Sequence, residues 1–347
     1  MLKADHIFHY PGDFSLEAGG VLHGFQLKYT TLGSLSAARD NVIWICHALT
    51  GNSDTSSWWA GLFNEGSPFD HRDYFVISAN SLGGCYGSTG PLSVDPKKGR
   101  PFYHDFPAIT NHDIIRAFDL LREELNLEQV HTVLGGSLGG QQALEWAVQK
   151  PEVFQHVIPI ACNAVHSPWG IAFNEAQRMA IAADSSWKEN DARAGIEGMK
   201  AARAMGMISY RAHQTFAVTQ AEKNFDQLDD FRAASYQRYQ GQKLANRFNA
   251  FTYWTLSKAM DSHNIGRGRG SAEKAMARIK ARTLVVGIES DILFPLSEQK
   301  FIADHIPGAQ LEVLQSLYGH DGFLADVEAL KGIVKKFYQQ KSVQIFL

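Results

Sequence analysis

A serine flanked by glycines lies where a predicted strand meets a predicted helix. The run Gly135-Gly136-Ser137-Leu138-Gly139 matches G-x-S-x-G and follows an apolar segment that ends at Leu134. In this context the pattern holds a serine in a tight turn, with the following helix N-terminus aimed at any nascent anion. An ordinary glycine-rich turn is the alternative, because Gly is common in this chain (30 residues). We predict that Ser137 is a nucleophile.

A serine hydroxyl needs a base to remove its proton and an acid to orient that base. After a G-x-S-x-G serine these partners follow in the order acid, then histidine. Asp291 lies just beyond the apolar run Leu284–Ile288, and Glu289 is a competing acid nearer the strand end. Pro295 and the helical pattern after it favour an acid held in a loop, hence Asp291. His320 precedes the last helical pattern and is the predicted base.

The loop after an early strand is expected to complete the site. His47 begins the sequence HALTG directly after the run Val42–Cys46. Such a loop supplies one backbone N–H to a tetrahedral oxyanion, and the residue after the nucleophile supplies the other. We therefore predict the N–H groups of Leu49 and Leu138 as oxyanion donors. We expect His47 itself to support the loop.

Strand and helix patterns alternate along the parts of the chain that carry these residues. Short apolar runs bounded by turn residues predict buried strands at Val42–Cys46, Tyr74–Ala79, Val130–Leu134, His156–Ala161, Leu284–Ile288 and Gln310–Leu314. Helical periodicity predicts helices at Ile109–Leu125, Gln141–Gln149 and Phe323–Tyr338. This alternation predicts an α/β fold with a mostly parallel sheet and helices on both faces.

The alternation stops in the middle of the chain. From about residue 167 to residue 270 the composition is helical and offers no good strand. We predict one core domain made of residues 1–166 and 271–347, interrupted by a helical insertion at 167–270. Insertions above the carboxyl edge of a sheet usually cap a site, so we interpret the insertion as a lid. A surface elaboration without function is the alternative.

Composition excludes several classes of function. The chain has 347 residues, and its 33 basic against 36 acidic residues give a net charge of −3, which excludes a dominant basic surface for nucleic acid or anionic membrane. No apolar run is long enough to span a bilayer, and the N-terminus lacks the apolar region of a signal peptide. Three scattered cysteines without a C-x-x-C pair favour a reducing compartment, so we expect a cytoplasmic protein.

Weaker patterns are assigned structural roles. The chain lacks H-E-x-x-H and Cys/His ligand spacings, so no metal is expected. The glycine-rich run 80–91 is expected to form a tight loop under the site rather than a phosphate cradle. The run GRGRG at 266–270 is expected to be a structural junction. Trp58 and Trp59, near the oxyanion loop, are expected to be core residues.

Taken together, the motifs go beyond a lone G-x-S-x-G. The combination of HALTG (47–51), LGGCYGSTGP (82–91), GGSLGGQQALEW (135–146), ARTLVVGIESDILFP (281–295) and YGHDGFL (318–324) resembles the homoserine O-acetyltransferase family over nearly the whole chain. This resemblance implies an α/β-hydrolase fold with a helical lid, often homodimeric through that lid. It implies acetyl transfer from acetyl-CoA, a co-substrate and not a permanently bound cofactor, to L-homoserine in methionine synthesis.

The resemblance also implies roles for single residues. It makes Ser137, Asp291 and His320 a catalytic triad. Arg203 matches the lid arginine that pairs with the substrate carboxylate, although by itself it could belong to a solvated helix face.

Three further positions match the same pocket. Asp321 matches the residue that receives the substrate ammonium, although it could simply be an acid at a helix N-terminus. Thr50 and Tyr210 match other positions near the substrate.

Donor and acceptor stay open at this point. Some family members use succinyl-CoA, and some acetylate serine. The segment between Asp184 and Met199 departs from the family's pattern by being shorter than in many relatives, which leaves the details of the lid, and therefore the acyl selectivity, open. The same triad without control of water would give an esterase or thioesterase.

Overall fold

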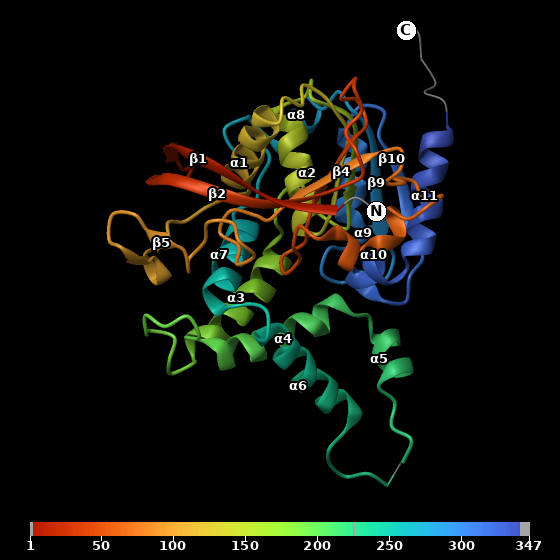
Figure 1. The fold of residues 1–347 in the computed structure, drawn as a ribbon. Coiled ribbons are helices and arrows are strands. Elements are labelled where there is room, and N and C mark those ends of the chain that lie inside the picture. Colours follow the sequence, from red (N-terminus) through yellow and green to blue (C-terminus); the bar gives the residue numbers. More distant parts are fainter. Residues whose placement is uncertain (1–2, 225, 341–347) are drawn as a thin grey trace.

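The computed structural model describes residues 3–224 and 226–340, and an eight-stranded sheet forms its centre, in the order β1-β2-β4-β3-β7-β8-β9-β10 (Figure 1). The strands are β1 (Lys3–Ser15), β2 (Val21–Leu32), β3 (Val42–Cys46), β4 (Phe75–Ala79), β7 (Val130–Gly136), β8 (Phe154–Ile160), β9 (Arg282–Ile288) and β10 (Gln310–Leu314). From β4 to β10 all neighbouring pairs are parallel. The predicted parallel sheet is confirmed, with strand ends shifted by a few residues.

The first two strands were not predicted. They form a long antiparallel hairpin, and β2 continues the sheet by pairing antiparallel with β4. Pro11 lies within β1, where the register shifts between Tyr10 and Asp13. A proline inside a run argues against a strand unless the strand lies at an edge or carries a bulge, and β1 does both.

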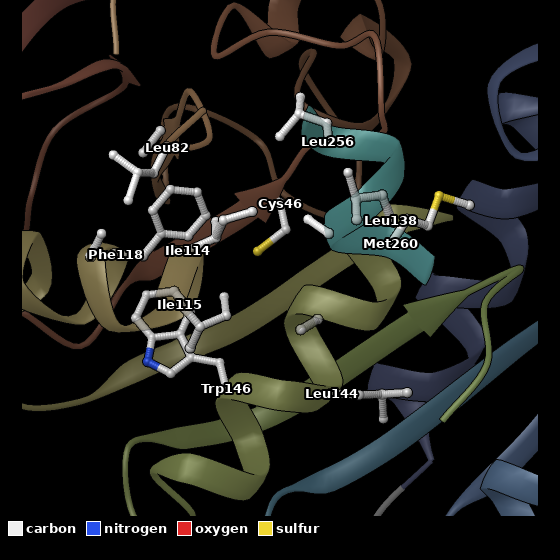
Figure 2. Close-up of a cluster of buried hydrophobic side chains, with 14 of the residues drawn as sticks. Cys46, Leu82, Ile114, Ile115, Phe118, Leu138, Leu144, Trp146, Leu256 and Met260 are labelled. Atoms are coloured by element: carbon white, nitrogen blue, oxygen red, sulfur yellow. The ribbon is translucent and has the colours of Figure 1, made fainter. Parts of the chain in front are cut away.

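Apolar side chains on both faces of the sheet form two cores. In β3, Val42, Trp44 and Cys46 belong to one core, while Ile43 and Ile45 belong to the other. The first core is covered by α1 (Asn111–Glu124), α2 (Leu138–Gln149), α8 (Ala272–Met276) and α9 (Leu296–His305), and Figure 2 shows part of it. The second is covered by α10 (Gly322–Ala325) and α11 (Val327–Gln339).

The C-terminal helix differs from its prediction. The range Phe323–Tyr338 was expected to be one continuous helix, but α10 and α11 are separated at Asp326, whose φ of −102° and ψ of 49° are not helical.

Short strands and 3₁₀ helices (labelled η) complete the described chain: η1 (Thr55–Ser57), η2 (Ala60–Leu62), β5 (Val94–Asp95), β6 (Arg100–Pro101), η3 (Tyr103–Asp105) and η4 (Gly319–Asp321). Among the described residues, no helix has the length and apolar character needed to cross a membrane.

Between β8 and α8 the chain forms a helical segment, which we call the lid (residues 167–270). Its helices are α3 (Pro168–Ala182), α4 (Ile196–Tyr210), α5 (His213–Thr219), α6 (Arg232–Ala245) and α7 (Ala250–Asp261). In Figure 1, α4, α5 and α6 lie below the sheet, on the side away from α1 and α8. The chain leaves and re-enters the core at one place, where Val165 and Asn264 form an isolated β-bridge.

Two kinds of contact fix the lid to the core. Leu256 and Met260 of α7 belong to the same apolar core as Leu138 at the start of α2 (Figure 2). Arg269 donates two hydrogen bonds to the buried carboxylate of Glu145, at 2.7 and 3.0 Å. The run 266–270 is therefore a structural junction, as predicted.

Candidate active site

Ser137 lies in a strained turn between β7 and α2. Its φ of 60° and ψ of −125° place a non-glycine residue in a region that L-amino acids rarely adopt. A Cβ on Gly139 would lie 2.0 Å from the carbonyl oxygen of Cys46, and one on Gly135 would lie 2.4 Å from the carbonyl carbon of Gly139. The glycines of the motif are thus required by close backbone contacts, and they allow the turn that presents the serine.

Asp291 and His320 form a buried pair. Asp291 Oδ2 lies 2.6 Å from His320 Nδ1, and both residues are less than 5% exposed. The other carboxylate oxygen of Asp291 accepts the backbone N–H groups of Leu293 and Phe294, at 2.8 and 2.9 Å. These bonds fix the carboxylate, so His320 Nδ1 is the donor and Nε2 is left to act as a base. Glu289, the competing acid, is exposed.

The charges around His320 favour its protonated form. Burial alone would lower the pKa of His320, but the carboxylates of Asp291 and Asp321 outweigh burial and raise it above the usual value. Phe294 stacks on the imidazole with ring centroids 5.1 Å apart, which helps to fix the ring plane. The histidine is therefore both oriented and made a better proton acceptor.

A cavity of about 430 Å³ joins the predicted residues from core and lid. Ser137 and His320 line it from the core. Its wall contains most of the other residues predicted for the site, namely Leu49, Thr50, Arg203, Tyr210 and Asp321. Asp291 lies behind His320 and does not line the cavity. Residues far apart in the sequence, from both core and lid, are thus brought to one space.

Of the two predicted oxyanion donors, Leu138 directly follows the serine and Leu49 lines the cavity. Leu138 is the first residue of α2, so its N–H has no acceptor within the helix. The loop that carries Leu49 is supported by His47, whose Nε2 accepts the N–H of Ser81 at 3.0 Å while Nδ1 donates to the Ala48 carbonyl at 2.9 Å. Burial lowers the pKa of His47, as a neutral supporting histidine requires.

The glycine-rich run 80–91 lies directly under this loop. The side chain of Asn80 accepts the N–H of Ser53 at 2.8 Å and donates to the carbonyl of Tyr86, also at 2.8 Å. The run is therefore a packed supporting loop, as predicted.

Opposite charges face each other between lid and core. Arg203 of α4 lies over the ring of Tyr210, 5.3 Å from its centroid, and forms no ion pair with any described residue. Asp321, next to His320, is paired with Arg211, whose Nε lies 3.0 Å from its Oδ2. Arg211 was not predicted. The signal available in the sequence was a second arginine directly after Tyr210.

Other cavity residues were also missed. Trp58 was expected in the core, but only Trp59 is buried there, with its indole N–H donating to the Phe323 carbonyl at 2.8 Å. Trp58 stacks on Trp59 and lines the cavity. Lys243 at the end of α6 and Arg247 in the turn after it also line the cavity, although their sequence context carries no signal that separates them from solvated cations. The described residues include no cluster of three or more His, Cys, Asp or Glu placed to hold a metal ion.

The chain is similar to known proteins over nearly its whole length. Residues 41–326 match the family model described as the alpha/beta hydrolase fold. Homoserine O-acetyltransferase of Cyclobacterium marinum is 51% identical over 97% of this chain and 95% of its own. The enzyme of that name from Trichormus variabilis is 45% identical, over 98% of this chain and 95% of its own.

Solved structures share the fold. Homoserine O-acetyltransferase from Bacillus anthracis has a TM-score of 0.90 at 24% identity, covering 98% of this chain and 99% of that one. Esterase E22 has a TM-score of 0.86 at 22% identity, over 97% of this chain and 100% of that one. The chain belongs to the α/β-hydrolase fold family and, within it, to the homoserine O-acetyltransferase family.

Proposed function

We propose that this protein transfers an acetyl group from acetyl-CoA to the side-chain hydroxyl of L-homoserine, a step of methionine biosynthesis. The observation that carries the proposal is the placement of Arg203 and Asp321 on the same cavity wall as Ser137 and His320. One cation and one carboxylate beside a nucleophile suit an α-amino acid, which carries both charges. Curated relatives 41–51% identical to this chain bear the corresponding name.

The first half of the reaction loads the serine. His320, oriented by Asp291, accepts the proton of Ser137 as its hydroxyl oxygen attacks the thioester carbonyl. The N–H groups of Leu49 and Leu138 stabilise the oxyanion, and each such donor contributes about 3 kcal/mol. The tetrahedral intermediate collapses, CoA leaves as the thiol with the proton from His320, and the acetyl group stays on Ser137.

The second half transfers the acetyl group to the acceptor. The carboxylate of homoserine binds Arg203 and its ammonium binds Asp321, while Thr50 and Tyr210 complete the pocket. His320 removes the proton of the homoserine hydroxyl, whose oxygen attacks the acetyl-serine ester; the ester bond to Ser137 breaks, and His320 returns the proton to the Ser137 oxygen. Fixing the hydroxyl in line gives it an advantage over water, which must be excluded for transfer to exceed hydrolysis.

The acyl donor is expected to approach past the cations of the lid. Lys243 and Arg247 line the cavity together with the aromatic surface of Trp58. Coenzyme A carries several phosphate charges, and Lys and Arg are the usual partners of phosphate. This supports acetyl-CoA as a co-substrate that leaves after each turnover.

Hydrolysis is the second candidate function. Solved structures named as esterases share the fold with TM-scores of 0.86 and 0.85, so the fold alone does not separate the two activities. Arg203, which has no acidic partner in the described part of the chain, favours transfer, because hydrolysis of a simple acetyl ester has no use for a carboxylate clamp.

The deciding experiment mixes protein, acetyl-CoA and L-homoserine and follows free thiol and acylated product. We expect sustained thiol release that depends on homoserine and matches O-acetylhomoserine formation. Release of equal rate without an acceptor would identify a hydrolase. Faster turnover with succinyl-CoA, or with L-serine, would correct the donor or the acceptor.

Loss of the nucleophile is the matching test of the site. Ser137→Ala should show no acetyl adduct by mass spectrometry after incubation with acetyl-CoA, whereas the wild type should gain one acetyl group per chain. A surviving adduct in the variant would move the nucleophile to another residue.

Assembly and location complete the proposal. We expect a homodimer through the lid, supported by large apolar side chains that are exposed on its helices: Met179, Met205, Ile208 and Tyr239. Removing such surface from water is the usual driving force of a homodimer interface. We expect the protein in the cytoplasm, where its three cysteines, free in the structure, would remain reduced.

A further inference from the structure

Arg211 lies behind the acceptor pocket. It follows α4 directly, and its Nε lies 3.0 Å from Asp321 Oδ2. It does not line the cavity, whereas Asp321 does. Its guanidinium also lies over the ring of Tyr318, 5.7 Å from the centroid. Arg211 therefore forms an ion pair with a carboxylate that itself lines the substrate space, although its buried Nε makes no hydrogen bond.

The position of Arg211 relative to Asp321 is fixed by close backbone contact between lid and core. Gly319, one residue before His320, has a φ of +64°. A Cβ at this position would lie 2.6 Å from the Ala212 nitrogen and 2.8 Å from the Arg211 carbonyl carbon. Thr215 Oγ1 also donates to the Leu317 carbonyl. The end of α4 is thus packed directly on the loop that carries His320 and Asp321.

The charges around Asp321 come from three elements. Arg203 and Arg211 come from the lid, His320 comes from the same turn, and Asp291 comes from the loop after β9. Burial raises the pKa of Asp321, and Asp291 adds to this, while Arg211 is the first of the cations that oppose it. An arginine cannot lose its charge at ordinary pH, so it is a constant counter-ion.

We propose that Arg211 is a positioning residue that keeps the Asp321 carboxylate ionised and aimed at the ammonium group of the acceptor. The inference rests on the proposed function, because it assumes that an amino acid occupies the cavity. It assigns Arg211 a part in acceptor specificity through Asp321, without contact to the acceptor itself. Arg203 and Arg211 then have different roles: one binds substrate, the other holds the residue that binds it.

The test measures the homoserine KM of Arg211→Met against pH, in steady state with acetyl-CoA in excess. Without its counter-ion Asp321 takes up a proton more readily. The KM of the variant should therefore be about tenfold above that of the wild type at neutral pH, and this difference should grow as the pH is lowered from about 8 to about 6. Asp321→Asn, which has no carboxylate to take up this proton, should have a high KM, and its remaining pH dependence, that of His320, should be the same in the double variant. Arg211→Lys should restore much of the wild-type profile.

Two measurements separate this role from general damage. The acceptor 4-hydroxybutyrate lacks the ammonium, so Arg211→Met should change its kcat/KM by less than about twofold. The acetyl adduct on Ser137 should form at the wild-type rate. Arg278→Met, at an exposed arginine outside the cavity, is the matched control and should match the wild type throughout.

The contrary results are equally clear. A homoserine KM in Arg211→Met that is raised equally at every pH, or a matching loss with 4-hydroxybutyrate, would overturn the inference. If the wild type shows no homoserine-dependent thiol release, the proposed function fails first, and that result is read independently of any Arg211 variant.

Discussion

At the scale of single residues, the two oxygens of Asp291 have separate tasks. One accepts two backbone N–H groups, and the other faces His320 Nδ1. In Asp291→Asn the amide oxygen would keep the backbone bonds, so the amide NH2 would face the histidine. His320 would then have to accept at Nδ1 and carry its proton on Nε2, where it cannot act as a base.

We therefore expect Asp291→Asn to lower kcat by about 10⁴-fold with little effect on stability. The rate of acetyl adduct formation and the urea unfolding midpoint measure the two effects. Glu289→Gln is the matched control, because Glu289 is exposed and lies two residues before Asp291 in the same loop. The kcat of this variant should stay within about twofold of the wild type. Equal losses in both variants would contradict the assignment of the acid.

The residues that the sequence revealed are those tied to strand ends. Ser137, Asp291 and His320 each follow an apolar run, and parallel strands bring their carboxyl ends to one edge, so their meeting could be predicted. Arg211, Trp58 and the cavity cations could not be. Their roles depend on how lid helices turn toward the core, and amphipathic patterns leave that orientation open.

At the scale of elements, the turn from β7 to α2 depends on the absence of side chains. Gly139 approaches the Cys46 carbonyl at the end of β3, so β3, β7 and α2 meet there. Gly139→Ala would force the Cβ to within 2.0 Å of that oxygen, and the helix would have to move away from the strand.

We expect Gly139→Ala to destabilise the fold by at least about 3 kcal/mol and to abolish acetyl adduct formation, because the displaced helix carries the Leu138 N–H. Urea unfolding at neutral pH and mass spectrometry of the adduct provide the measurements. Gly332→Ala in α11 is the control: nothing lies near its added methyl, and it should stabilise by about 0.5–1 kcal/mol. A Gly139→Ala protein as stable as the wild type would refute the packing argument.

The prediction of helices and strands succeeded where a segment shows one clear pattern of apolar residues. The parallel strands from β3 to β9 are mostly buried apolar runs, and these were all found together with the half-buried edge strand β10. The β1–β2 hairpin was missed because Pro11 and a bulge interrupt its pattern and its outer positions are polar. The break at Asp326 was missed because apolar periodicity continues across it.

At the scale of the whole molecule, the place where lid meets core is built from buried polar groups. His263 is 3% exposed and contacts the Asn163 carbonyl at 3.2 Å, while its own carbonyl accepts the N–H of His166 at 2.9 Å. His166 contacts the side chain amides of Gln141 and Asn174. Both histidines of this junction are neutral at neutral pH, because burial lowers the pKa of His263 to about 4 and that of His166 to about 3.

This junction gives the stability of the protein a defined dependence on acid. The unfolded chain binds the His263 proton with a pKa of about 6.5, above the folded value of about 4, so the stability is complete above pH 6.5 and falls as the pH drops toward 4. At about pH 5 the loss of stability from His263 alone is about 2 kcal/mol.

His263→Gln removes that titration. When the pH is lowered from about 8 to about 5, the free energy of unfolding of this variant should therefore fall by about 2 kcal/mol less than that of the wild type. Urea unfolding at both pH values measures the difference, and His9→Gln, at an exposed histidine, should leave it unchanged. If His263→Gln and the wild type lost the same free energy of unfolding between these two pH values, the junction would not be keeping His263 neutral.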